Sequence, residues 1–137
     1  MRRGRRLGPV RRTLLAGEIL MTYASVHRLL RRHTLPETVA ALRRGRLAAP
    51  AADAATLALG RHLAWATVRT ITLLPVDSRC LMRSLVLTRV LARRGLRSTF
   101  VLSAAPGPQF EAHAWVELDG EPLLLPAGAD HEQLIRL

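Results

Sequence analysis

The chain has 137 residues, a formal net charge of +11 and a single cysteine. Its length and charge indicate one strongly basic domain with a modest core. All 21 basic residues are arginine, and the absence of lysine and asparagine excludes a phosphate-binding-loop lysine, a Schiff base, a Ser–Lys dyad and a Cys-His-Asn triad. A lone cysteine also excludes an internal disulfide and a cysteine-rich zinc site.

The sequence has no stretch that would span a membrane as a helix. Its longest run without Asp, Glu, Arg or His covers residues 98–110, which is shorter than the roughly 20 apolar residues that a bilayer requires. Residues 1–12 are rich in arginine like the start of a secretory signal, but Glu18 interrupts the apolar segment that should follow, and no cleavage site is evident. We therefore expect a protein of the reducing bacterial cytoplasm.

The chain begins with a basic segment and an amphipathic helix. Residues 1–12 hold six arginines, two glycines and a proline, so we expect a flexible basic arm there. In residues 13–32 the apolar side chains recur at helical spacing, which predicts a helix whose buried face includes Leu15, Ile19, Tyr23, Val26 and Leu30.

Capping residues mark the starts of the next two helices. Thr34 and Glu37 have the spacing of a capping box, which predicts a short second helix. Residues 48–52 are typical of a linker, and Asp53 then caps a third helix of about 20 residues. Its buried face would include Leu57, Ala64, Val68 and Ile71.

A fourth helix carries the only cysteine. Asp77 or Ser78 would cap this helix, which runs to about Arg94 and stops at Gly95. Cys80 then lies in the first turn, where free N–H groups and the positive end of the helix dipole favour a thiolate. The same N–H groups would stabilise an oxyanion on a substrate carbonyl. The alternative is a small buried hydrophobic residue.

Strands follow the fourth helix. Residues 98–103 and 112–118 are predicted strands, Asp119-Gly120 is a hairpin turn signal, and residues 123–125 form the return strand. Helices followed by a small antiparallel sheet indicate an α+β domain over residues 13–137. Its helical part covers residues 13–74 and its second part, with the cysteine and the sheet, covers residues 75–137.

His113 is the second candidate for a chemical role. It lies in the predicted strand between Ala112 and Ala114, which leave room around the imidazole, and its face of the strand also carries Trp115 and Glu117. A satisfied core histidine is the alternative. No pair of histidines has metal-ligand spacing together with a third ligand, so neither a metal nor another cofactor is expected. The remaining histidines are on arginine-rich helical segments or in the tail: His27, His33, His62 and His131.

A cysteine that opens a helix, followed by a histidine on a strand, is the order found in papain-like and transglutaminase-like enzymes. The run Cys80-Leu81-Met82-Arg83-Ser84-Leu85, with Phe110-Glu111-Ala112-His113-Ala114-Trp115-Val116-Glu117 downstream, closely resembles the lasso-peptide leader peptidases. These are the stand-alone peptidase half of a split maturation protein. The resemblance covers about residues 75–125 and implies a transglutaminase-like, papain-like fold.

The resemblance implies a cysteine peptidase that removes the leader peptide from a ribosomally made lasso-peptide precursor, a step in antibiotic biosynthesis. Cys80 would be the nucleophile, and His113 would take its proton and later protonate the leaving amine. A separate small leader-binding protein would present the leader. An asparagine-synthetase-like cyclase would then close the ring on the core peptide.

The sequence departs from the family at the third catalytic residue, an aspartate on the strand after the histidine. If residues 118–120 form a three-residue loop, Glu117 pairs with Glu121 and His113 faces Leu125, which occupies the position of the family's aspartate. Leucine neither accepts the imidazole N–H nor stabilises its charged form.

Several readings of this departure remain. Asp130, Glu111, a backbone carbonyl or a water molecule would orient the imidazole, or the Cys–His pair works alone, since a thiolate–imidazolium pair exists at rest. In the alternative reading, the protein is a weak or inactive binding member of the same maturation complex.

The charge of +11 raises a competing function, nucleic-acid binding. Aromatic residues make up only 4% of the chain, the arginines are spread along all four predicted helices, and no nucleic-acid-binding motif stands out. A basic first helix would also suit a membrane surface. We expect the basic surface to meet an acidic leader peptide or the leader-binding partner, with no specific nucleic acid.

Overall fold

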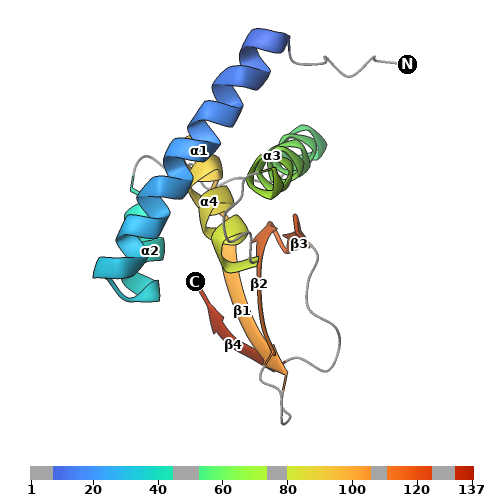
Figure 1. Cartoon of the computed structure of the whole chain (residues 1–137). Helices are drawn as coiled ribbons and strands as arrows, with labels where there is room; N and C mark the ends of the chain where they lie inside the picture. The colour runs from blue at the N-terminus through green and yellow to red at the C-terminus, as the bar shows by residue number, and fades with distance from the viewer. Residues whose placement is uncertain (1–7, 45–52, 74–79, 106–110, 125–131) are drawn as a thin grey trace.

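Helices precede strands along the chain, as the sequence predicts for an α+β domain. A computed structural model describes residues 8–44, 53–73, 80–105, 111–124 and 132–137. Within them lie four helices, α1 (Pro9–Arg32), α2 (Leu35–Leu42), α3 (Ala54–Thr72) and α4 (Cys80–Ala92). The strands are β1 (Thr99–Ala105), β2 (Glu111–Leu118), β3 (Glu121–Pro122) and β4 (Glu132–Arg136) (Figure 1). None of these helices is both long and apolar enough to cross a membrane.

The predicted capping residues explain where two helices begin. Thr34 and Glu37 form the capping box at the start of α2, because each side chain accepts the other residue's backbone N–H, at 3.4 and 2.9 Å. Asp53 caps α3 by accepting the N–H of Thr56 at 2.8 Å. Both contacts satisfy N–H groups that the first turn of a helix leaves without an internal partner.

Helix α1 begins earlier than predicted. Its first residue is Pro9, so residues 9–12 of the expected flexible arm are helical, whereas residues 1–7 lie outside the described residues. Proline suits the first helical position because its fixed φ is already helical and its missing N–H would have no partner there. The exposed side chains of residues 9–12 explain why no apolar periodicity marks this extra turn.

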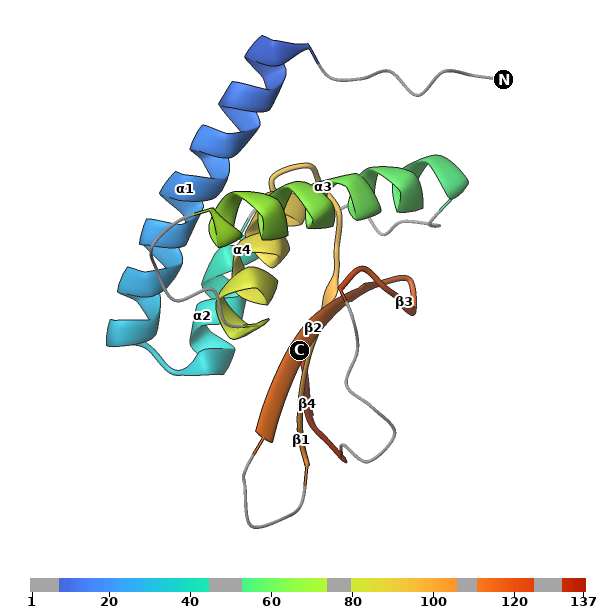
Figure 2. The same ribbon diagram turned by 45° about the vertical axis from the view of Figure 1, so that its right-hand side comes forward.

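Helix α4 forms the centre of the domain. Nine of its 13 residues are buried, and it packs against α1, α2, α3 and the two long strands (Figures 1 and 2). A helix that buries most of its residues, on several of its sides, lies inside a core rather than on its surface. Beyond it, Gly95 takes a φ of 74°, and Leu96 donates its N–H to Leu91 O at 3.0 Å, which closes the helix end as predicted. The cap expected at Asp77 or Ser78 lies outside the described residues.

The sheet presents one face of β2 to the helices. Its strands are antiparallel in the order β3-β2-β1-β4. Ala114, Val116 and Leu118 alternate along β2 and are all buried, the first two of them within the core cluster that α4 crosses. His113 and Trp115 lie on the opposite face because successive side chains of a strand alternate.

The hairpin after β2 differs from the prediction by one residue. Asp119 and Gly120 both have positive φ, 51° and 78°, which makes a two-residue turn of type I′ rather than a three-residue loop. Leu118 therefore pairs with Glu121, and Glu117 pairs with Pro122 instead of Glu121. The expectation that His113 faces Leu125 was built on the three-residue loop, and Leu125 itself lies outside the described residues.

The sheet differs from the prediction at two further places. Strand β3 spans residues 121–122, whereas Leu123 and Leu124 of the predicted return strand follow it in a bend and Leu125 lies outside the described residues. Strand β4, which was not predicted from the sequence, pairs with β1. The pairing extends to Leu137, which exchanges backbone hydrogen bonds of 2.7 and 2.8 Å with Phe100. Its pairing joins residues more than 25 positions apart, which no local pattern reveals.

Candidate active site

The sequence predicts Cys80 in the first turn of a helix, and within the described residues α4 begins at Cys80, whose side chain is half-buried. The N–H groups of the first four residues of a helix have no partner within the helix. The thiol therefore stands beside N–H groups that suit the oxyanion of a bound substrate.

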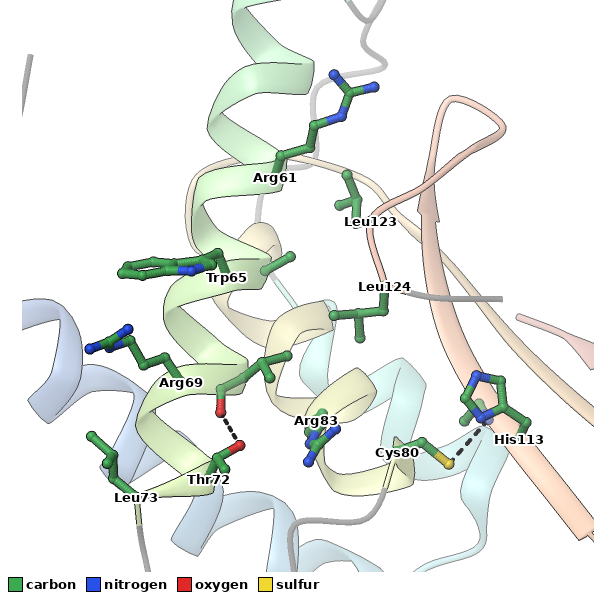
Figure 3. Close-up of a pocket in the computed structure, with 13 residues that line it drawn as sticks. Arg61, Trp65, Arg69, Thr72, Leu73, Cys80, Arg83, His113, Leu123 and Leu124 are labelled. Carbon is green, nitrogen blue, oxygen red and sulfur yellow. Dashed lines mark hydrogen bonds between the residues drawn. The ribbon is translucent and has the colours of Figure 1, made fainter. Parts of the chain in front are cut away.

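The thiol also touches the sheet. The backbone N–H of Ala114 donates a hydrogen bond to Cys80 Sγ at 3.4 Å (Figure 3). Val116, two residues further along β2, accepts the N–H of Leu123 at 2.9 Å on the edge of β2 that faces β3. Backbone groups two residues apart in a strand point to the same edge, so the N–H of Ala114 points to the β3 edge of β2, beyond the end of β3. The sulfur of Cys80 therefore accepts the hydrogen bond that a neighbouring strand would otherwise accept.

His113 lies next to this contact and shares a cleft with Cys80. Its imidazole is half-buried and stacks on the indole of Trp115, with ring centroids 5.9 Å apart and planes 28° from parallel. Figure 3 shows the His113 ring beside the sulfur of Cys80. The fold thus brings together the two predicted site residues, which are 33 positions apart in the chain.

Trp115 is itself held in place by a chain of polar contacts. Its indole Nε1–H donates to Glu117 Oε1 at 3.1 Å, and Arg136 of β4 donates to Glu117 Oε2 at 2.7 Å. Trp115 is only 5% exposed. Because one carboxylate binds both groups, Glu117 fixes the indole and joins β2 to the far strand of the sheet. The indole is a rigid wall against which the imidazole of His113 rests.

The cleft has a volume of about 710 Å³, within the range of ligand-binding pockets. It lies between α3, the start of α4, β2 and the segment after β3. Apolar residues of α3 and of that segment form its walls, with Cys80 and His113 at one end (Figure 3). Three arginines also line it, namely Arg61, Arg69 and Arg83. Among its described lining residues none is acidic.

This cleft was not predicted from the sequence. No sequence pattern indicated that the backbone N–H of Ala114 or the face of α3 that contains Trp65 belongs to a functional site. The only local signal was a tryptophan placed four residues from an arginine on each side, Arg61 and Arg69. The sequence predicts Leu124 in the return strand, but in the structure Leu124 follows β3 in a bend and lines the cleft.

The other candidate side chains do not meet at this cleft. His27, His33 and His62 are exposed, with His33 3.6 Å from Glu37 and His62 stacked on Trp65. Within the part of the chain that the structure describes, no three His, Cys, Asp or Glu residues are grouped to hold a metal ion. The remaining residues considered for the third catalytic role or for the tail lie outside the described positions or side chains: Glu111, Leu125, Asp130 and His131.

Comparison with known proteins identifies the family. The transglutaminase-like superfamily matches residues 19–134, which is most of the chain and includes α4 and the sheet. No curated protein and no solved structure matches the chain.

Proposed function

The chain belongs to the transglutaminase-like superfamily, whose members are commonly cysteine peptidases, and we propose that it removes the leader peptide from a lasso-peptide precursor. The observation that carries the proposal is that Cys80, the first residue of α4, and His113 of β2 line the same cleft. The resemblance of both segments to the leader peptidases supports the choice of substrate.

The reaction requires a nucleophile and a proton carrier. Cys80 Sγ, with its proton passed to His113, attacks the carbonyl carbon of the scissile bond and forms a tetrahedral intermediate. The N–H groups at the start of α4 stabilise its oxyanion. His113 then donates its proton to the leaving amine, which leaves a thioester on Cys80. Water, deprotonated by His113, hydrolyses the thioester and restores the thiol.

The contacts around the pair suit these steps. The N–H of Ala114 holds Cys80 Sγ in place by its hydrogen bond. The stacked Trp115 restricts the rotation of the imidazole. Through these contacts the cleft orients both groups before a substrate arrives, which is how positioning lowers the barrier of such a reaction.

The partners follow from the same proposal. A separate leader-binding protein presents the leader to the cleft, and an asparagine-synthetase-like cyclase closes the ring on the released core peptide.

The test combines the purified protein with the precursor and the leader-binding protein, and detects cleavage by mass spectrometry. We expect the leader to be released by the wild type and retained with Cys80→Ala, with loss of activity also in His113→Gln. Cleavage at the wild-type rate by Cys80→Ala would remove Cys80 as the nucleophile. Binding of the leader without cleavage by the wild type would favour the scaffold role instead.

A further inference from the structure

A stripe of α3 faces the cleft with a composition that the reaction itself does not need. Arg61, Trp65 and Arg69 recur every four residues, so their backbone positions lie on one side of the helix. All three are exposed and line the cleft; in Figure 3, Arg61 extends from α3 on the side of Leu123, whereas Trp65 and Arg69 extend on the other side, away from Cys80 and His113. None of them contributes to the chemistry proposed for Cys80 and His113, yet they form the wall along which a bound peptide would pass.

The tryptophan in this stripe is unusually exposed for its size. Trp65 is 58% exposed and Leu73, two turns further along α3 on the same wall, is 79% exposed. Large apolar side chains that are exposed together mark binding surfaces more often than isolated ones do. The guanidinium carbon of Arg69 lies 5.2 Å from the centre of the indole ring of Trp65, and His62 stacks on the same indole at 6.2 Å. These contacts hold the indole in a fixed position, which lowers the entropy that binding would cost.

The charged side chains that line the cleft, among the described residues, are all positive. Arg61 and Arg69 flank Trp65, Arg83 adds a third cation, and no carboxylate is present among the described lining residues. A wall of this kind attracts anions and repels basic side chains. Guanidinium groups bind carboxylates with two parallel hydrogen bonds, so the ligand that suits the wall carries carboxylates.

The spacing of the stripe defines the ligand further. Eight residues of helix separate Arg61 from Arg69, a distance of about 12 Å along the axis. In an extended peptide, side chains four residues apart point to the same side and are separated by about 13 Å. This spacing applies to the backbone of α3, since the side chains of Arg61 and Arg69 extend in different directions (Figure 3). A peptide with two acidic residues about four positions apart and an apolar residue between them carries the groups that Arg61, Arg69 and Trp65 bind.

We infer that this stripe of α3 is a specificity site that binds an acidic segment of the substrate peptide beside the scissile bond. The inference rests on the proposed peptidase function for the identity of the ligand. It extends that function by naming the substrate class and the residues that select it. A nucleic acid is the other polyanion that an arginine–tryptophan wall would attract. We favour the peptide because the same cleft holds Cys80 and His113.

The experiment measures binding in the Cys80→Ala protein, which does not turn over a substrate. The probe is the fluorescein-labelled peptide Gly-Ala-Glu-Ala-Phe-Ala-Glu-Ala-Gly, and its comparison peptide has Gln in place of both Glu residues. Fluorescence anisotropy gives the Kd of each. Two exposed ion pairs correspond to a preference of about two- to thirtyfold for the Glu peptide at low salt. This preference should decrease as the salt concentration rises.

A matched pair of variants locates the effect. Arg61→Gln/Arg69→Gln should abolish the preference, whereas Arg28→Gln/Arg31→Gln removes the same charge from exposed positions of α1 and should preserve it. Glutamine is a good helix former, so both variants are expected to fold, and circular dichroism checks this. Trp65→Ala should weaken binding of the Glu peptide. It should leave unchanged the Kd of a variant Glu peptide that has Ala in place of Phe.

Three outcomes overturn the inference. They are equal affinity for the Glu and Gln peptides, a preference that survives in Arg61→Gln/Arg69→Gln, and tighter cleft-dependent binding of a labelled single-stranded oligonucleotide than of the Glu peptide. Failure of the peptidase proposal gives a different result, since the precursor would stay uncut while the Glu peptide still bound the stripe. Conversely, cleavage of the precursor with no acidic preference would overturn only the specificity site.

Discussion

Replacing Glu18 with Gln should weaken the attachment of α1 to the end of the central helix α4 with almost no change in side-chain size. The side chain of Glu18 is 21% exposed. Its two carboxylate oxygens accept hydrogen bonds from the two terminal nitrogens of Arg94, at 3.1 and 2.9 Å, and Arg93 lies 3.5 Å from one of them. The pair therefore has the two-pronged geometry in which arginine binds carboxylates most strongly.

The magnitude follows from the number of partners. One exposed ion pair contributes about 0.2–1 kcal/mol, and Glu18 has a doubly bonded partner and a second arginine nearby. We expect Glu18→Gln to lower the free energy of unfolding at neutral pH by about 1–2 kcal/mol. For a chain of this size, that loss corresponds to a decrease in Tm of roughly 3–8 °C.

The same contact should make stability depend on pH. Burial acts to raise the pKa of Glu18, but the hydrogen bonds and charge of Arg94 and the charge of Arg93 outweigh it and hold the pKa below the ordinary value of 4.5. A carboxyl whose pKa is lower in the folded state stabilises the fold at pH values above its unfolded pKa. That contribution is lost as the pH falls through the folded pKa.

Urea unfolding followed by circular dichroism, at a series of pH values from 7 down to 3, tests this reasoning. The stability difference between wild type and Glu18→Gln should be complete at pH 7 and should shrink below about pH 4.5. In a double-mutant cycle, Arg94→Gln should cost less in the Glu18→Gln background than in the wild type. Equal stabilities at pH 7, or a difference that persists undiminished at pH 3, would refute the account of this ion pair.

Four further substitutions test the fold and the site. Leu87→Ala, at a fully buried position of α4, should lower the free energy of unfolding by about 2–5 kcal/mol, and a loss under 1 kcal/mol in urea unfolding would show that the core collapses around the gap. Trp115→Ala should reduce the initial rate of precursor cleavage by about 10- to 100-fold, because His113 would be misplaced. Trp115→Phe should retain most of the rate, and equal losses in both variants would contradict a stacking role. Gly120→Ala should cost about 1–2 kcal/mol because its φ is +78°, and thermal unfolding measures it. Gly17→Ala in α1, where no atom lies within 4 Å of the added methyl group, should instead stabilise the protein by up to about 1 kcal/mol, and a lower Tm would contradict this.

Local patterns in the sequence were enough to predict the helices and the two residues of the candidate pair. The capping box of Thr34 and Glu37 and the cap at Asp53 act within one turn, so the residues that make them are neighbours in the chain. The position of Cys80 in the first turn of α4 follows from the same kind of reasoning. His113 was identifiable because its strand alternates and because its flanking alanines are distinctive.

The register of the hairpin was beyond local reasoning. Asp119-Gly120 is compatible with a three-residue loop and with a two-residue turn, and the local sequence does not choose between them. In the folded chain Leu118 is buried beside Gly60 of α3, and a methyl group added at Gly60 would lie 3.0 Å from the Leu118 side chain. A slip of one residue would turn the buried side of a strand outward, so packing against the helices selects the register.

What the sequence alone determined, then, is the set of parts: helices with their caps, a cysteine at a helix start and a histidine on a strand. Only the tertiary structure decided how the parts meet. The N–H of Ala114 reaches Cys80 because β3 stops at Pro122, and Arg61 reaches the same cleft because α3 packs across α4. Each of these contacts joins residues that are distant in the chain, and such contacts depend on the packing of the whole core rather than on any local pattern.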